Sequence, residues 1–263
     1  MIDLHCHVLP GIDDGAADRL ASIEMLHAYA ADDVDRVVAT PHLRADFPQV
    51  VPAEIAGRCA AMQAAAAAEG LDVEIVSGGE VSLTWALDAS DDVLEAVSIG
   101  GLGRDLLIET PSNPLGPGVD QALFAIALRG YRVTLAHPEL SRAFQRTPES
   151  LSALVRRGIL LQVTSSSLQR APRRSGSATL AQALVRDGLC AAIASDAHSA
   201  GPWRPPELTR GLVAAARIAD PARAEWLVTD APAAIIAGEP LPNPPSGAPT
   251  TRGRAWLRRR VGV

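Results

Sequence analysis

Residues 3–16 read DLHCHVLPGIDDGA, a short apolar strand pattern that carries two histidines and runs into a turn with paired aspartates. His5 and His7 are two positions apart, so on an extended strand both imidazoles point to the same face. Cys6 lies between them and faces the other way. We interpret this stretch as the first strand of an α/β fold, with a pair of metal ligands at its end.

The two-residue spacing recurs at two later strand ends. Asp196 and His198 aim a carboxylate and an imidazole to one side of the chain, and His137 and Glu139 do the same. Three such pairs, each at the end of an apolar run, are hard to explain by packing. Further candidates at or just beyond predicted strand ends are His42, Glu80, Glu109, Asp13 and Asp14.

Apolar, β-branched runs alternate with alanine-rich helical patterns along the chain, which favours a parallel sheet with helices outside it. We predict strands at Ile2–His5, Asp35–Thr40, Asp72–Ser77, Asp105–Glu109, Arg132–Ala136, Ile159–Thr164 and Cys190–Ala194. We predict helices at Ala17–Ala31, Ala53–Glu69, Thr84–Ala96, Val119–Arg129, Pro148–Arg157, Ala178–Asp187, Pro205–Ile218, Pro221–Val228 and Ala231–Ile236. A single domain of this length is typical of an α/β barrel. We take 1–237 as that domain and 238–263 as a flexible, Pro- and Arg-rich tail with little role in the core.

In such barrels the carboxyl ends of the strands meet at one mouth, so the candidate ligands should converge there. Nitrogen and oxygen donors without thiolates suit manganese, iron or zinc in a multinuclear site. Taken singly, His42 and Glu109 could be loop residues, Glu80 could flank a helix cap, and Asp14 could belong to an Asp-Gly turn. His27 sits among apolar residues of a helix, and we interpret it as structural.

Charge and composition exclude several functions. All 24 basic residues of the 263 are arginine, which excludes a Walker A lysine and a Schiff-base lysine. The net charge of -6 argues against a nucleic-acid partner. No cysteine is followed six positions later by arginine, which argues against a cysteine-based phosphatase. The apolar runs are too short to span a membrane and the N-terminus lacks a signal-peptide pattern, so we expect a cytoplasmic protein.

These motifs resemble the PHP (polymerase and histidinol phosphatase) superfamily, and are most similar to the bacterial protein-tyrosine phosphatases of capsule and exopolysaccharide operons, the CpsB/YwqE type. The resemblance covers residues 1 to about 236. It implies a distorted (β/α)7 TIM-like barrel with three metal ions, usually Mn²⁺, with iron or zinc as alternatives. The residues that it implies as metal ligands are His5, His7, Asp14, His42, Glu80, Glu109, His137, Asp196 and His198.

The resemblance also implies an activity. A hydroxide that bridges the metals would attack the phosphorus of a phosphotyrosine protein, such as an autophosphorylated membrane-bound bacterial tyrosine kinase. Arg204 would neutralise charge on the phosphoryl oxygens, His42 or His198 could protonate the leaving oxygen, and Glu139 would lie near the metals. In the family, an arginine that helps to bind the substrate phosphate follows the His-Pro-Glu motif. Here that position is Leu140, and Arg142 could bind the phosphate instead.

Two other functions fit the same residues. One is a small-molecule phosphatase of the histidinol phosphatase type or a nuclease-like phosphoesterase, and the other is a weakly active metal-binding regulator of polysaccharide assembly. The five arginines of the tail would suit loose attachment to anionic lipid. They are Arg252, Arg254, Arg258, Arg259 and Arg260.

Overall fold

Parallel strands alternate with helices through most of the computed structural model, which describes residues 1–110, 118–172 and 175–245. The strands are β1 (Ile2–Cys6), β2 (Arg36–Ala39), β3 (His42–Leu43), β4 (Glu74–Ser77), β5 (Glu80–Ser82), β6 (Asp105–Glu109), β7 (Arg132–Ala136), β8 (Leu160–Thr164) and β9 (Ala192–Ala194). Each predicted strand is present, and β6 and β7 have the predicted bounds. The short strands β3 and β5 were not predicted.

Two strand paths are each broken into two strands. Thr40 and Pro41 separate β2 from β3, and proline has no amide hydrogen to donate to a ladder. Gly78 and Gly79 separate β4 from β5, and both lie tightly against their neighbours. A Cβ on Gly79 would lie 2.6 Å from a methyl carbon of Leu43. These breaks let each path begin in one sheet and end in another.

The two sheets are parallel throughout. β1, β2 and β4 form one sheet in that order, and the other has the order β3-β5-β6-β7-β8-β9. The outer strands β1 and β9 contact each other, and an isolated parallel bridge joins Cys6 to Ala197. The hydrogen-bonded ladder is interrupted and no closed barrel is seen among the described residues, so the predicted distorted (β/α)7 TIM-like barrel is not confirmed. The α/β class with parallel sheets is confirmed.

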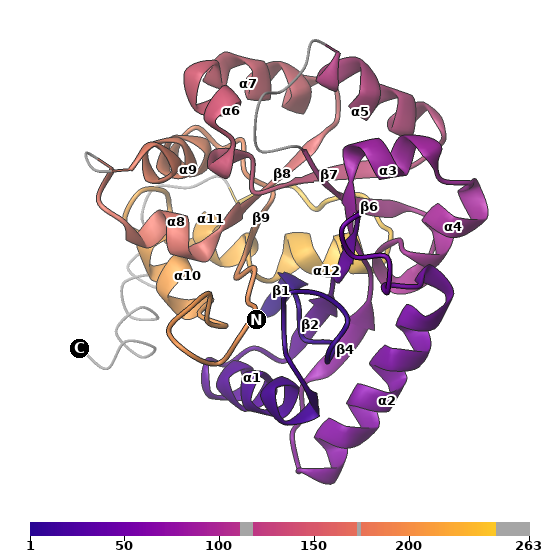
Figure 1. Cartoon of the computed structure of the whole chain (residues 1–263). Helices are drawn as coiled ribbons and strands as arrows, with labels where there is room; N and C mark the ends of the chain where they lie inside the picture. Colours follow the sequence, from indigo (N-terminus) through magenta and orange to yellow (C-terminus); the bar gives the residue numbers. More distant parts are fainter. Residues whose placement is uncertain (111–117, 173–174, 246–263) are drawn as a thin grey trace.

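Helices surround the strands, which lie at the centre of the view in Figure 1. They are α1 (Arg19–Ala31), α2 (Ile55–Ala68), α3 (Leu83–Asp88), α4 (Asp91–Ala96), α5 (Val119–Leu128), α6 (Arg142–Arg146), α7 (Pro148–Arg156), α8 (Ser165–Gln169), α9 (Gly176–Arg186), α10 (Thr209–Ala215), α11 (Pro221–Trp226) and α12 (Asp230–Ile236). Short 3-10 turns occupy Pro52–Glu54, Ile99–Gly101 and Pro138–Leu140. Side-chain caps help to start α1, where the Asp18 carboxylate accepts from the amide of Ala21.

Apart from shifts of up to four residues at helix ends, as where the predicted Pro205–Ile218 is α10 (Thr209–Ala215), the helices differ from prediction in three places. The predicted helix Thr84–Ala96 is two helices, because the backbone is extended at Ala89 and Ser90. The short helices α6 and α8 were not predicted, and both follow strand ends near the site. The serine-rich start of α8 has no apolar periodicity that would have predicted a helix.

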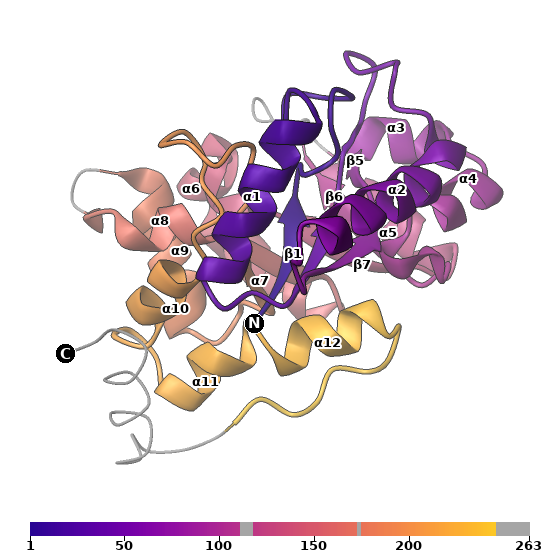
Figure 2. The ribbon, with the colours of Figure 1, turned by 90° about the horizontal axis from the view of Figure 1, so that it is seen from below.

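The amino ends of the strands are covered by the last two helices. Figure 2 shows α11 and α12 on the side where β1 begins, opposite to the side toward which β1 points. The amide of Ile2 donates to the carbonyl of Val228 at 2.8 Å, and Ile235 of α12 packs with Leu4 and Leu107 of the strands. A larger apolar core lies between the strands and the outer helices. The opposite, carboxyl side of the strands is left for the loops.

The described part of the predicted tail contacts the domain. Leu241 packs against the core, and Arg132 Nη1 donates to the carbonyl of Glu239 at 2.5 Å. Residues 246–263, which include the basic segment Arg252–Arg260, lie outside the described residues. None of the described helices has the length and apolar character needed to cross a bilayer.

Candidate metal centre

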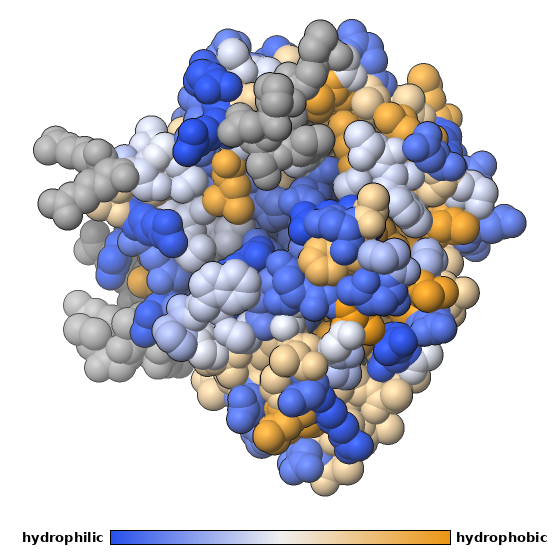
Figure 3. Space-filling model, in the orientation of Figure 1, coloured by the Kyte–Doolittle hydropathy of each residue, from blue (hydrophilic) through white to orange (hydrophobic). Residues whose placement is uncertain are grey.

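A cavity of about 320 Å³ opens at the carboxyl ends of the strands. The face in Figure 3 is hollowed near its centre, and the atoms around the hollow are mostly hydrophilic. Its lining includes Asp14, His42, Glu109, His137 and Asp196. The predicted site residues therefore gather at the mouth that the strand ends define.

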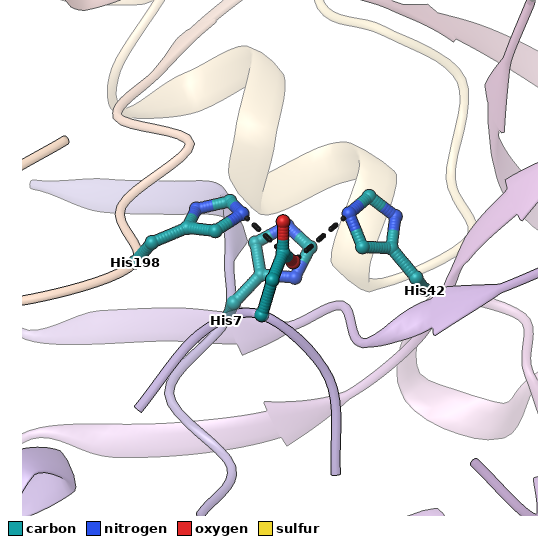
Figure 4. Close-up of side chains that lie close together, drawn as sticks. His7, His42 and His198 are labelled. Atoms are coloured by element: carbon teal, nitrogen blue, oxygen red, sulfur yellow. Dashed lines mark ion pairs between the residues drawn. The ribbon is translucent and has the colours of Figure 1, made fainter. Parts of the chain in front are cut away.

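Three imidazoles meet around one carboxylate at this mouth. Figure 4 shows His7, His42 and His198 turned toward a common point, although they come from the end of β1, the first residue of β3 and the loop after β9. Asp14 Oδ1 lies 3.3 Å from Nε2 of His42 and 3.3 Å from Nε2 of His198. His7 and His198 also lie close, with ring centroids 3.9 Å apart.

Glu80 is the centre of the buried part of the cluster. Its Oε2 lies 2.8 Å from His42 Nδ1, 3.3 Å from His5 Nε2 and 3.4 Å from His7 Nε2. Its Oε1 lies 2.7 Å from His137 Nε2. The glycine pair before Glu80 restarts the strand there, so that the carboxylate enters the second sheet beside β3 and β6. One carboxylate is thus within reach of four imidazoles.

Asp196 and His198 reach the site through unusual backbone. Asp196 has φ of +56°, a left-handed conformation that non-glycine residues seldom adopt. Its amide donates to the carbonyl of His5 at 2.9 Å, which fixes the turn beside β1. Asp196 Oδ1 then lies 3.4 Å from Nε2 of His5. His137 and Arg204 also have positive φ, so backbone strain concentrates around this site.

All nine predicted metal ligands are brought together. Their donor atoms form four overlapping groups in which all atoms lie within 4.8 Å of one another. The groups are His7, Asp14, His42 and His198; His5, His7 and Asp196; His5, Glu80 and His137; and His42, Glu80 and Glu109. His27, by contrast, is exposed on α1 and belongs to none of these groups.

The spacing and the unpaired atoms fit metal ions. The buried atoms Glu80 Oε2 and Asp196 Oδ1 have no hydrogen-bond partner among the described residues, although imidazole nitrogens surround them. Bonds of about 2.0–2.2 Å to one ion place neighbouring ligand atoms about 3.0–3.5 Å apart. Three of the separations lie in that range, which is longer than a good hydrogen bond: Glu80 Oε2 is 3.3 Å from His5 Nε2 and 3.4 Å from His7 Nε2, and Asp196 Oδ1 is 3.4 Å from His5 Nε2.

A layer of side chains behind the cluster orients the imidazoles. Asp13 Oδ2 accepts from His7 Nδ1 at 2.7 Å, and Gln162 Oε1 lies 3.1 Å from His5 Nδ1. His198 Nδ1 lies 3.0 Å from the carbonyl of Asp196. A proton on each of these Nδ1 atoms leaves Nε2 free to bind a metal. The role of Gln162 was not predicted, and a polar residue inside the apolar strand pattern was its only signal in the sequence.

The electrostatics follow from burial and these contacts. Burial would raise the pKa of Asp13, but the hydrogen bond and charge of His7 lower that pKa to about 2. Burial, together with the positive charges of His7 and Arg204, lowers the pKa of His198 to about 2. Burial alone would lower the pKa of His137, but Glu80 raises it to about 10. His198 is therefore neutral near pH 7, the state that a metal ligand requires, whereas His137 is protonated near pH 7 and would release its proton on binding a metal.

The predicted phosphate-binding residues are placed less simply. Arg204 lines the cavity, forms an ion pair with Asp196 Oδ2, and places Nη1 2.8 Å from His198 Nε2. Glu139 is fully buried beneath the cavity, where its Oε1 accepts from the amide of Thr164 at 2.8 Å. Leu140 lines the cavity, whereas Arg142 is exposed on α6 and is not among the described lining residues. Arg142 is thus not placed to take over the task of a missing arginine.

Buried hydroxyl groups also line the cavity. Ser141, Thr164 and Ser167 line it and are buried. Ser141 Oγ and Thr164 Oγ1 have no hydrogen-bond partner among the described residues. Buried hydroxyls without a partner are costly, so these two are available to a polar ligand.

A family model described as "Capsular polysaccharide synthesis, CpsB/CapC" matches residues 1–237. The chain belongs to the CpsB/CapC family. The match covers all nine candidate metal ligands.

Relatives of this CpsB/CapC chain are named as tyrosine phosphatases, and two of them as metal-dependent. It is 30% identical to the tyrosine-protein phosphatase YwqE of Bacillus subtilis, over 76% of this chain and 78% of that protein. It is 26% identical to the tyrosine-protein phosphatase CpsB of Streptococcus pneumoniae, over 90% of this chain and 98% of that protein. A crystal structure from a study of these two proteins, which describes them as unique metal-dependent tyrosine phosphatases, superposes with a TM-score of 0.82. It covers 94% of this chain and 99% of that chain at 26% identity.

Proposed function

We propose that this chain is a metal-dependent phosphomonoester hydrolase that removes phosphate from tyrosine residues of a bacterial protein. The observation that carries the proposal is the convergence of nine nitrogen and oxygen donors around one cavity, in a chain of the CpsB/CapC family. The relatives are named as tyrosine-protein phosphatases and as metal-dependent. The cavity of about 320 Å³ has room for one phosphotyrosine side chain.

The nine side chains would hold three metal ions, with manganese as the proposed metal. When bound, such ions polarise the phosphoryl oxygens and make a water molecule acidic enough to serve as nucleophile near pH 7. Glu80, Asp196 and the histidines around them would form the buried part of the centre, and Glu109 and Asp14 the part nearer to solvent. Carboxylate and imidazole donors suit manganese, and the absence of thiolates from the described groups argues against a closed structural zinc site.

Arg204 would bind the phosphoryl group. In this structure its guanidinium contacts Asp196 and His198 Nε2, atoms that a metal would use. The lone pair of His198 Nε2 cannot both accept a hydrogen bond from Arg204 and bind a metal. With His198 bound to a metal, the guanidinium would turn into the cavity that it already lines. There it would neutralise charge on the phosphoryl oxygens. The unpartnered hydroxyls of Ser141 and Thr164 would donate to the same group.

Proton transfer would depend little on the cluster histidines. His198 is neutral near pH 7 and donates its remaining proton to a backbone carbonyl, so it is a poor acid. His42 lies between Asp14 and Glu80, and would be occupied as a ligand. A phenolate is a good leaving group and needs little help from an acid, which favours phosphotyrosine over alkyl phosphates.

The proposed partner is a phosphotyrosine protein, such as an autophosphorylated membrane-bound kinase of capsule or exopolysaccharide synthesis. Such a substrate would place the enzyme in the cytoplasm. Attachment of the basic tail, 238–263, to anionic lipid would keep it near that kinase. We further propose that the two sheets are parts of one distorted seven-path barrel, an arrangement supported by the contact between β1 and β9 and the bridge from Cys6 to Ala197.

Metal analysis and a substrate panel test this function. We expect bound manganese, activity that is lost on chelation and restored by Mn²⁺, and a higher kcat/KM on a phosphotyrosine peptide than on histidinol phosphate. His5→Ala, Glu80→Ala and Asp196→Ala should each lose both metal and turnover. A preference for histidinol phosphate would exclude the tyrosine phosphatase. Full metal occupancy with negligible turnover on every phosphomonoester would indicate a regulator.

A further inference from the structure

A groove leads away from the metal centre along two short helices. The active-site cavity shares Ser166 and Arg170 with a second cavity beside it, and that cavity shares Arg170 and Arg210 with a third one farther out. Helices α8 and α10 pack side by side at this point (Figure 1). Gly211 permits their close approach, because a Cβ there would lie 2.9 Å from Ser165 Cα. Arg170 thus stands where the catalytic cavity opens into the groove.

The groove is basic in an acidic protein. Its two outer cavities are lined by four arginines, of which Arg204 faces the metal centre, against one described carboxylate, Glu207. Glu207 already pairs with Arg210 at 3.1 Å. Arg170 and Arg217 are exposed and form no ion pair with the described residues, whereas the whole chain has a net charge of -6. Two uncompensated cations in line with the active site provide a charge pattern that a neutral ligand would not use.

We propose that this groove binds the acidic residues that flank the phosphotyrosine of a protein substrate, with Arg170 next to the tyrosine and Arg217 several residues along the peptide. The proposal rests on the proposed phosphatase function and adds a sequence preference to it. A peptide fits the observations, because the groove is continuous with the cavity that would take the phosphorylated side chain. The cations lie in a concave channel rather than on a flat face, which favours an extended chain over a lipid surface.

The effect of each arginine should be modest. An exposed ion pair contributes a factor of about two to five in affinity, and salt weakens it. Arg170→Gln and Arg217→Gln should therefore each reduce binding of an acidic peptide by about two- to fivefold. Binding of a neutral peptide should not change. Arg19→Gln is the matched control, because Arg19 is exposed on α1, has no ion pair with the described residues, and lies outside the groove.

The test uses two peptides of equal length that carry a non-hydrolysable phosphotyrosine analogue, one with Asp and Glu flanks and the other with Asn and Gln. Fluorescence anisotropy with the metal-loaded full chain gives the ratio of their Kd values at low and high salt. We expect the parent and Arg19→Gln to prefer the acidic peptide, and the two groove variants to lose part of that preference. Equal affinity of the parent for both peptides, or groove variants that behave as Arg19→Gln does, would overturn the proposal.

Turnover separates this inference from the function on which it rests. The groove should not affect p-nitrophenyl phosphate, which is too small to reach Arg217, so kcat/KM of Arg217→Gln on that compound should equal the parent value. If neither phosphotyrosine peptides nor p-nitrophenyl phosphate are hydrolysed, the phosphatase function fails, while the ratio of Kd values still decides the groove.

Discussion

Replacing Asp13 tests whether the layer behind the imidazoles sets metal affinity. Asp13 Oδ2 accepts from His7 Nδ1 at 2.7 Å and from the amide of His42 at 3.1 Å, and its Oδ1 accepts from the amide of Gly15 at 3.0 Å. Alanine removes all three hydrogen bonds. His7 is then free to move its proton to Nε2, the nitrogen that must be unprotonated to bind a metal.

The expected loss follows from these contacts. Loss of a partner behind a metal ligand lowers metal affinity about 10- to 100-fold, which is about 1.4–2.7 kcal/mol. Asp13→Ala should lie near the upper limit. Asp13→Asn should lie near the lower limit, because an amide oxygen can keep the bond to His7 without the charge. The side-chain NH2 group of the asparagine would then face the backbone N–H of Gly15, and both are donors. Whichever way the side-chain amide is turned, one of the two acceptor atoms is lost.

Competition with a fluorescent chelator measures Mn²⁺ affinity, and kcat/KM at saturating Mn²⁺ shows whether the site recovers. Asp72→Ala is the control, since Asp72 is exposed and precedes β4, at the amino ends of the strands and not at the carboxyl ends where the cluster lies. We expect affinity to fall in the order parent, Asn, Ala, with activity partly restored by excess metal. Mn²⁺ affinity of Asp13→Ala equal to that of the parent would refute the reasoning.

Three further predictions concern the thiols, the cation and one glycine. Burial raises the pKa of Cys190 to about 12, so at pH 8 only about one molecule in 10,000 carries the thiolate. The thiolate becomes common only as pH rises through that pKa. After treatment with iodoacetamide at pH 8, mass spectrometry should find no adduct on the folded chain, and activity should persist. Arg204→Ala should lower kcat/KM by about 30- to 1,000-fold, or about 2–4 kcal/mol, with metal content by plasma mass spectrometry retained; a variant as fast as the parent would exclude the role. Gly15→Ala would place a Cβ 2.2 Å from a carbonyl oxygen and should cost about 1–3 kcal/mol in urea unfolding, whereas Gly57→Ala, with open space around it, should not destabilise.

The order of strands and helices could be predicted from the sequence because it depends on local patterns. β6 and β7 have their predicted bounds because a short apolar run between polar residues shows where each strand begins and ends. The convergence of the candidate ligands could also be predicted, because neighbouring parallel strands bring their carboxyl ends to one side. His5 and His7 needed only the two-residue period of a strand.

Contacts between distant segments were decided by the tertiary structure. The breaks at Pro41 and at the Gly78–Gly79 pair divide two strand paths between sheets, and they depend on close packing against neighbours such as Leu43. Gln162 faces His5 from 157 positions away, and no local pattern can predict that pairing. Arg204 reaches Asp196 and His198 through a left-handed backbone, which local propensity disfavours. The sequence alone therefore determined which residues could bind metal and at which end of the fold, because strand period and strand order are local properties. Only the folded chain decided which side chains orient those ligands and where the basic groove runs, because these depend on packing between residues far apart in the sequence.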